Sequence, residues 1–480
     1  MKWFCLFVLI LPALCFAQPD TLWTRTYGGS GDEYTSGIVA LPGGDFVVSA
    51  STNSYGLGGM DFYLLRITPT GDTVWTQTFG RGPDDDWCNG ITRTASGDIV
   101  ASGYGYSTTF QHQVVRDVTF NDAGVLSGWA DQSTLTSDAF GFGVCSNTNG
   151  RTADAGYWTS GNGQGQILLY QYFNGEPGQH PLYVAHGYYA DAHSVQPTTD
   201  GGYILAGSTR ATADANSNFL LVRTTSTLDT IWTATYGGTG EDIVNCVIQT
   251  RDGGFAFTGP TDSYGAGGGD VVLFKTDANG QLQWMHTYGG DDEEHGHVII
   301  QTQDGGYFIA GHTTSFGTGG DVYCVKTDSM GNLQWTRYWG GDGLDVAQSA
   351  VELPDGGFLV AAQTTSFGAG NSDIWVLRIA PPLAANEPPA QLPNGFALMQ
   401  NYPNPFNAST RISYELPRDG HVALTVFDLL GNARASLFNG SQTAGHHELD
   451  VSSSALPSGV YFYRLDAAGW SNTRKMIVLK

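Results

Sequence analysis

The sequence predicts an all-β protein, a seven-bladed β-propeller followed by a small immunoglobulin-like β-sandwich. A repeated unit recurs at steps of 49 to 54 residues, marked by Trp23, Trp75, Trp129, Tyr183, Trp232, Trp284 and Trp335. Each unit offers four short strand-like runs between turns rich in Gly, Asp and Ser. Residues 396–480 lack the unit and show alternating runs of a different kind.

The copy at 333–379 shows the unit most clearly. A strand marked by a Trp enters a Gly-Gly loop with acids, and an alternating strand then reaches an Asp-Gly-Gly turn. A second strand opens on an aromatic residue, a Ser-aromatic-Gly-x-Gly loop follows, and an apolar strand runs from an Asp to a Lys or Arg. Four strands at this period are typical of a propeller blade, so seven units predict seven blades.

Tight turns set the boundaries of the blades. The turn at 68–72 and its equivalents join each Asp-led strand to the next Trp strand, which predicts a hairpin within one blade. Blade one then spans 34–79 and blade six 294–339. The last blade has only three strands in 345–380. We expect its outer strand to come from Thr21–Tyr27, because joining the chain ends removes open sheet edges.

The N-terminus reads as a secretory signal peptide at residues 1–17, with Lys2 before an apolar core and Ala17 before the cut. No later stretch is apolar enough to span a bilayer. The propeller is expected to occupy 18–380, and the Pro-rich stretch 381–395 to be an extended linker.

The charge balance excludes two classes of partner. Without Lys2 the chain has 20 basic and 45 acidic residues, a net charge of −25. Nucleic-acid binding depends on neutralising phosphates with Lys and Arg, and anionic lipid surfaces also attract basic segments. The four Cys of the mature chain lack zinc-site spacing. We expect them to be small buried residues, with a Cys88–Cys145 bridge as the alternative.

Residues 104–187 depart from the repeat, with few Gly-Gly loops and many aromatic residues. Examples are Tyr157, Trp158, Tyr170 and Tyr172. They are either drifted core and surface aromatics or a specialised wall for a ligand, since aromatic side chains provide large contact areas.

Alignment on the residue after the Asp-Gly-Gly turn shows two columns. Thirteen positions earlier lies an acid column: Glu33, Asp86, Asp242, Glu294 and Asp345. Ten positions earlier lies a polar column: Ser36, Asn89, His193, Asn245, His297 and Gln348. We expect both columns to share one face of the innermost strand, where alternate side chains point the same way.

Each column has two interpretations. The polar column either faces water in a central channel or binds a ligand there, and Asn89, His193, Asn245, His297 and Gln348 are the candidate binding residues. The acid column either anchors the Gly-Gly loops through backbone N–H groups or binds Ca²⁺, which takes oxygen ligands. At the opposite end of the blades, cations can neutralise the Asp-Gly-Gly carboxylates: Arg66, Arg223, Lys275, Lys326 and Arg378.

The tail carries four specific sequence features: NYPNPFN at 401–407, VFDLLGN at 426–432, LPSGVYFYR at 456–464 and a terminal KMIVLK. In these the tail resembles the type A C-terminal sorting domain of the type IX secretion system. The resemblance implies transport through the periplasm and across an outer membrane by the type IX machinery, followed by removal of the tail. The sorting motif would then be Asn401, Tyr402, Pro403, Asn404, Pro405, Phe406 and Asn407. The repeats also look like those assigned to propellers of bacterial surface proteins, a resemblance that implies no substrate.

The chain shows no nucleophile elbow, HExxH, phosphate loop or EF-hand pattern. The leading hypothesis is a secreted or cell-surface, non-enzymatic binding or scaffold protein, with surface glycan or lipopolysaccharide as the partner. One alternative is a polysaccharide hydrolase or lyase with a site around His193, His297 and blade three. A second is a structural adhesion or surface-layer element.

Overall fold

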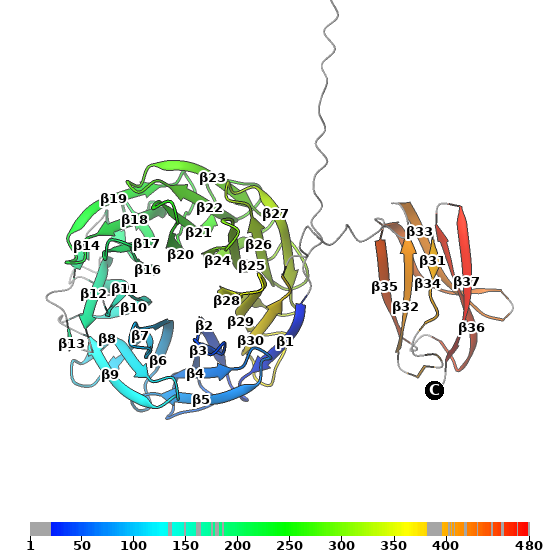
Figure 1. Ribbon diagram of the computed structural model, residues 1–480, viewed down its shortest axis with the longest axis horizontal. Helices are drawn as coiled ribbons and strands as arrows, with labels where there is room; N and C mark the ends of the chain where they lie inside the picture. Colours follow the sequence, from blue (N-terminus) through cyan, green and yellow to red (C-terminus); the bar gives the residue numbers. More distant parts are fainter. Residues whose placement is uncertain are drawn as a thin grey trace, which may run out of the picture. The chain divides into compact units, whose positions relative to one another are not determined.

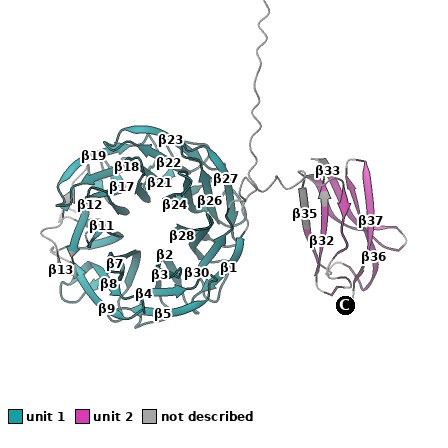
Figure 2. Ribbon diagram, viewed as in Figure 1, with its two compact units in different colours: residues 1–382 teal, residues 383–480 magenta. Residues whose placement is uncertain are grey.

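The computed structural model consists of strands and loops and divides into two compact units, residues 1–382 and 383–480 (Figures 1 and 2). In the first unit it describes residues 21–132, 137–147, 150–159, 165–173, 176–177, 182–184 and 187–381. In the second it describes 396–478 apart from 402–403, 405, 408, 417–419, 430, 443–444, 453–455 and 468. The expected signal peptide and most of the expected linker lie outside these residues. No helix in the described part of the chain is long and apolar enough to cross a membrane.

The first unit is a ring of seven sheets, which confirms the predicted propeller (Figure 1). Four blades have the regular four strands in chain order. Blade one comprises β2 (Glu33–Ala40), β3 (Phe46–Thr52), β4 (Asp61–Ile67) and β5 (Thr73–Phe79). Blade two comprises β6 (Asp86–Arg93), β7 (Ile99–Ser107), β8 (His112–Phe120) and β9 (Leu126–Gln132). Blade five comprises β20 (Cys246–Gln249), β21 (Phe255–Thr261), β22 (Asp270–Thr276) and β23 (Leu282–Tyr288). Blade six comprises β24 (Glu294–Gln301), β25 (Tyr307–Thr313), β26 (Asp321–Thr327) and β27 (Leu333–Trp339).

Blades three and four are less regular. The sequence between 104 and 187 predicted irregular blades two and three; this is wrong for blade two, which has the regular four strands. Blade three comprises β10 (Ala139–Ser146), β11 (Arg151–Thr159), β12 (Gly165–Phe173), β13 (Glu176–Pro177) and β14 (Leu182–Val184). Blade four comprises β15 (Tyr189–Ala190), β16 (Ser194–Pro197), β17 (Tyr203–Arg210), β18 (Asn218–Thr224) and β19 (Thr230–Tyr236). Both β13 and β14 pair with β12, so the outer strand of blade three is broken.

Blade seven is closed by the N-terminal strand, as predicted. It comprises β1 (Thr21–Tyr27), β30 (Asp373–Ile379), β29 (Phe358–Thr364) and β28 (Asp345–Glu352). Strand β1 runs antiparallel to β30 with Tyr27 opposite Ile374. The two ends of the ring therefore share one sheet, and no open edge remains between them.

The repeat motif follows from the packing between blades. The third strands β22, β26 and β30 are buried along their whole length, whereas the outer strand β5 alternates exposed and half-buried residues. The aromatic residue that ends an outer strand bonds the tight turn of the next blade: the hydroxyls of Tyr27 and Tyr288 each donate to a glycine carbonyl at 2.6 Å, that of Gly71 and that of Gly331. Each Trp-x-x-x-Tyr strand is thus matched to a turn 44 or 43 residues later.

The second unit is a β-sandwich of two sheets. One contains β31 (Ala397–Leu398), β32 (Ser409–Leu416) and β35 (Gly445–Ser452). The other contains β33 (Gly420–Phe427), β34 (Ala433–Gln442), β36 (Gly459–Ala467) and β37 (Trp470–Val478). Their inner faces share one core that includes Ile412, Leu424, Tyr463 and Met476.

Candidate functional site

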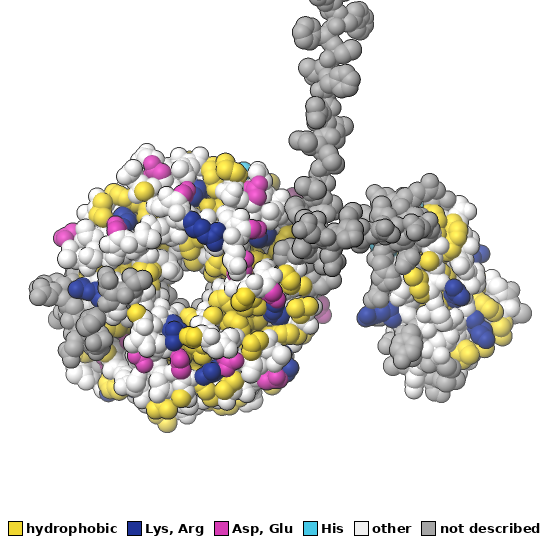
Figure 3. All heavy atoms as spheres, viewed as in Figure 1, with side chains coloured by type: hydrophobic (Ala, Val, Ile, Leu, Met, Phe, Trp, Pro, Cys, Tyr) yellow, Lys and Arg dark blue, Asp and Glu magenta, His cyan; other side chains and the backbone are white. Residues whose placement is uncertain are grey.

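The innermost strands surround the centre of the ring, which is hollowed (Figures 1 and 3). Four members of the polar column lie on these strands, His193 and Asn245 directly precede β16 and β20, and all six side chains are half-buried. Four of its members, Ser36, Asn89, His297 and Gln348, are the extra residue at a β-bulge. Blade three has the same bulge, with Phe142 in this place. Such a bulge puts two residues opposite one and redirects a side chain.

The bulge corrects the expectation that alternation alone places the acid and polar columns on one face. The two columns are three residues apart, as in Glu33 and Ser36, so a regular strand would turn them to opposite faces. The interrupted register next to Ser36 and its equivalents breaks that alternation. Strand alternation alone therefore does not support the expected shared face, and the position of the polar column depends on the bulge.

Two predicted binding residues join blades. The side-chain amide of Asn89 donates to the carbonyl of Gly141 at 2.7 Å, and that of Asn245 donates to Gly296 at 2.9 Å. Each acceptor lies on the innermost strand of the following blade. The amide hydrogens of these two Asn therefore stabilise the contacts between blades.

His193 is held by an ion pair. Its Nε2 lies 3.2 Å from Oδ2 of Asp191, and its ring meets Phe142 edge-on at 5.7 Å between centroids. Burial lowers the pKa of His193, but the hydrogen bond and charge of Asp191 outweigh burial, so the pKa is raised overall. This arrangement gives His193 a structural partner within its own blade.

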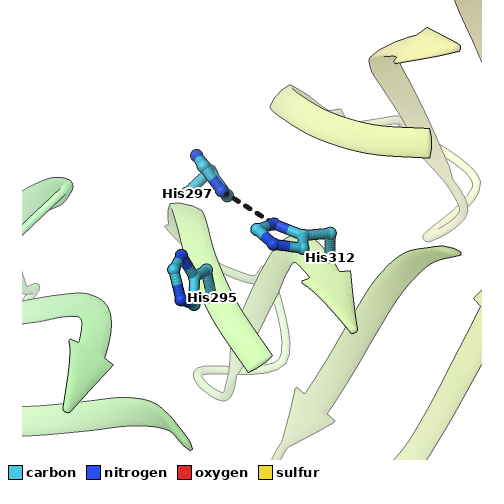
Figure 4. Close-up of side chains that lie close together, drawn as sticks. All are labelled: His295, His297 and His312. Atoms are coloured by element: carbon cyan, nitrogen blue, oxygen red, sulfur yellow. Dashed lines mark hydrogen bonds between the residues drawn. The ribbon is translucent and has the colours of Figure 1, made fainter. Parts of the chain in front are cut away.

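His297 belongs to a cluster that the polar column did not reveal. His295, His297 and His312 form a group in blade six, the His cluster, in which the possible ligand atoms all lie within 4.8 Å of one another (Figure 4). Burial, and then the neighbouring imidazoles, lower the pKa of His297 to about 3. Burial likewise lowers the pKa of His312 to about 4. His295 and His312 could have been found from the His-x-His spacing and the hairpin register.

The acid column anchors loops. All five carboxylates are buried. In blade five, Asp242 accepts the backbone N–H of Gly238 at 2.9 Å and the hydroxyls of Thr261 and Ser263 at 2.5 and 2.7 Å. Glu33, Glu294 and Asp345 make the equivalent bonds to Gly29, Gly290 and Gly341. Asp86 instead accepts Arg81 N–H and pairs with buried Arg116.

The N–H and O–H donors that bond the acid column lead to a prediction for the effect of Ca²⁺ on the stability of the propeller. A Ca²⁺ ion needs six to eight oxygen ligands, whereas the oxygens of the acid column already accept N–H and O–H donors. We expect the melting temperature of residues 18–385 to be the same in millimolar Ca²⁺ as in NaCl of equal ionic strength, since screening alone acts in both. A melting temperature raised by Ca²⁺ alone, and lowered again by a chelator, would show a bound ion.

The opposite end of the blades is neutralised, as expected from the sequence. Each cation of that column pairs with a carboxylate of the preceding turn: Arg66–Asp45, Arg223–Asp200, Lys275–Asp252, Lys326–Asp304 and Arg378–Asp355. Burial tends to raise the pKa of Asp252, but the hydrogen bonds from Lys275, Thr250 and Gly254 outweigh it and lower the pKa to about 2. At this end of the propeller, each cation of the column therefore forms an ion pair with a carboxylate.

A second group that the sequence did not reveal is a buried carboxyl pair between blades two and three. Asp117 and Asp154 are 3% and 1% exposed, and none of their carboxyl oxygens has a hydrogen-bond partner within the described part of the chain. Burial raises the pKa of Asp117 to about 7, and burial together with the charge of Asp117 raises the pKa of Asp154 well above its usual range. Asp117 also lines a cavity of about 320 Å³ with Trp129 and Tyr172.

The described residues of the sorting motif are built into the sandwich. Asn401 is buried, its N–H donates to the hydroxyl of Tyr463 at 2.7 Å, and its amide donates to Thr410 at 2.9 Å. Asn404 accepts the N–H of Ile477 at 2.8 Å. Phe406 is buried and Asn407 is exposed, whereas Tyr402, Pro403 and Pro405 lie outside the described residues. The motif thus holds the chain against the terminal strand β37.

Comparisons with known proteins support the tail. Residues 400–479 match the family model of the secretion system C-terminal sorting domain, which confirms the resemblance of this part of the chain. Such a domain implies that the chain meets the type IX secretion machinery and is exported to the cell surface or beyond it. No curated protein matches the chain.

Solved structures resemble the chain only in fold. A fungal alcohol oxidase of the AA5 family in complex with copper is 12% identical, with a TM-score of 0.48 over 97% of this chain and 100% of its own. Sqt1 of Chaetomium thermophilum is 9% identical, with a TM-score of 0.43 over 76% of this chain and 98% of its own. An α-L-arabinanase of Penicillium chrysogenum with arabinobiose is 11% identical, with a TM-score of 0.41 over 76% of this chain and 98% of its own. None of these likenesses carries an argument about activity.

Proposed function

We propose that this protein is a secreted or cell-surface binding module, a non-enzymatic propeller that the type IX system delivers through its tail. The sorting domain at 400–479 supports the export. The half-buried polar side chains around the channel support the binding role. The innermost strands form the channel wall, and some of its hydrogen-bonding groups are not occupied by contacts within the protein.

The binding role rests on one observation: some members of the polar column have hydrogen-bond partners within the protein, whereas Gln348 has none among the described residues. Asn89 and Asn245 bond the next blade, and His193 bonds Asp191. Gln348 is half-buried at the bulge of blade seven and makes no hydrogen bond to another described residue. Together with the His cluster of blade six it provides donors and acceptors on adjacent blades that a ligand can satisfy.

The ligand class that fits this wall is a neutral or hydroxyl-rich glycan. Amide and imidazole groups both donate and accept hydrogen bonds, which suits hydroxyl groups. The acid-rich chain would repel polyanions such as nucleic acid. We place the glycan at the channel mouth of blades six and seven, where Gln348 would reach it.

The experiment is a glycan array probed with the mature chain, followed by affinity measurements on the best glycan. We expect Gln348→Ala to weaken binding about tenfold or more, since a lost hydrogen bond to a bound polar group costs about 1–3 kcal/mol. The control is Thr233→Ala, an exposed change on the outer strand β19. Absence of glycan binding, or equal affinity of the two variants, would refute the binding site.

The cavity beside the carboxyl pair favours a second candidate, a polysaccharide hydrolase. Paired carboxyl groups beside an aromatic-lined cavity are the groups that glycoside hydrolysis uses. Against this, a catalytic acid must reach its substrate within hydrogen-bond distance, and Asp154 is 1% exposed. New reducing ends released from a bound polysaccharide, and lost in Asp117→Asn, would favour the hydrolase; binding without turnover supports the binding module.

A further inference from the structure

We propose that His295, His297 and His312 bind one transition-metal ion of the zinc or copper class at the inner end of blade six. This inference does not depend on the glycan. It starts from the hairpin of β24 and β25, which is the element that brings the three imidazoles together (Figure 4).

The strand geometry places the rings on one face. His295 and His297 are two residues apart on β24, and their ring centroids lie 6.4 Å apart. His312 lies directly opposite His295 on β25. The bulge at His297 interrupts the register between Gly296 and Val298, and His297 therefore sits beside its strand neighbours without a partner residue across the hairpin.

The distances suit a small ion. Nε2 of His297 lies 3.2 Å from Nδ1 of His312, and the ring of His295 is 4.7 Å from that of His312 between centroids. Zinc binds imidazole nitrogen at about 2.0–2.1 Å, so two nitrogens of a tetrahedral site lie about 3.3 Å apart. Two of the three donors already have this spacing, and the third lies within 4.8 Å of both. A small rotation of the His295 ring would complete the set.

The bonding of the rings distinguishes them from structural histidines. The Nε2 atom of His193 is paired with the carboxylate of Asp191. Within the described residues, the three rings of the His cluster make a single hydrogen bond, the one between His297 and His312. The other ring nitrogens of the cluster have no hydrogen-bond partner among the residues that the structure describes. Each ring would need only to carry its proton on the nitrogen that faces away from the ion.

The surroundings are suited to a divalent cation. All three rings are half-buried, so a fourth position stays open to solvent or to a ligand group. Three imidazoles with an open position are one of the usual zinc arrangements. The carboxylates of Glu293 and Asp262 act on His295 electrostatically, and nearby negative charge favours the bound cation.

The test uses the mature chain, stripped with chelator and titrated with Zn²⁺ in a calorimeter. We expect one ion per chain and an affinity that His297→Ala lowers by at least a hundredfold. The control, His286→Ala, removes an imidazole from the outer strand β23 and should bind as the unaltered chain does. Failure to bind one ion per chain, or equal binding by His297→Ala, would overturn the proposal.

A spectroscopic measurement separates ligation from a structural role. With Cu²⁺ in place of Zn²⁺, electron paramagnetic resonance should show hyperfine coupling to imidazole nitrogens, and the pattern should lose one nitrogen in His312→Asn. If either variant unfolds, the unaltered chain still decides, since Zn²⁺ bound to the folded state must raise its melting temperature. A copper spectrum without nitrogen coupling, or a melting temperature insensitive to Zn²⁺, would refute the site.

Discussion

Removal of Thr21–Tyr27 is expected to cost the propeller on the order of 5 kcal/mol of unfolding free energy. Strand β1 pairs with β30 over most of its length. Trp23 and Tyr27 pack against the core between blades seven and one, and the Tyr27 hydroxyl bonds Gly71. Truncation of a buried aromatic residue alone costs about 3–5 kcal/mol, somewhat less for these half-buried ones. A loss of this size approaches the whole stability of many domains, about 5–15 kcal/mol.

Denaturant unfolding of two single variants checks this without deleting the strand. Trp23→Ala should lose about 2–4 kcal/mol, because its ring packs on the core. Leu22 is 61% exposed on the same strand, and Leu22→Ala should change stability by about 0.5 kcal/mol or less. Equal stabilities for the two variants, or an unchanged melting temperature after the deletion, would mean that β1 does not close the ring.

The second large effect is a loss of stability with rising pH caused by Asp117 and Asp154. Both pKa values are raised in the folded state, chiefly by burial, that of Asp117 to about 7. A raised carboxyl pKa means that the folded state holds a proton that the unfolded chain releases near pH 4. The stabilising contribution is full below about pH 4 and is lost as the pH rises through 7, at on the order of 1 kcal/mol per pH unit.

The measurement compares unfolding free energies from pH 4.5 to 7.5 for the native chain and for Asp117→Asn with Asp154→Asn. The double variant cannot ionise at these positions, so its advantage over the native chain should grow with pH. Asp214→Asn, an exposed carboxyl in a loop, is the matched control and should run parallel to the native chain. Parallel curves for the double variant as well would show that neither carboxyl has a raised pKa in the folded state.

Much of the fold could be predicted because the residues that determine the structure of a blade recur in most copies of the repeat. The Trp strand and the buried Asp-led strand recur in most blades, and in three of them the Tyr that ends the Trp strand bonds a Gly turn. Their spacing therefore predicts seven blades and assigns each strand to its sheet. The shortage of one strand in 345–380 predicts the closure by Thr21–Tyr27. Acid-to-backbone anchoring could be anticipated too, since a carboxylate recurs four residues after the second Gly of each Gly-Gly loop, as Glu33 does after Gly29.

The candidate site was less predictable because it depends on departures from the repeat. A β-bulge at Ser36 or Gln348 leaves no distinct residue pattern, so the sequence alone could not place the polar column relative to the acid column. His312 is 15 residues from His297, and only the hairpin register brings the two rings together. Asp117 and Asp154 meet across blades two and three, in the least regular part of the sequence, where contacts follow from packing between sheets.

The central claim is that the tail exports a propeller that folds by itself. The most direct measurement is the location of the protein in a bacterium with a type IX system after deletion of residues 391–480. The account predicts a truncated propeller that melts as cooperatively as the propeller of the full chain yet stays inside the cell envelope, while the full-length chain reaches the surface or the medium without its tail. Truncated protein found in the medium at the level of the full-length chain would contradict it.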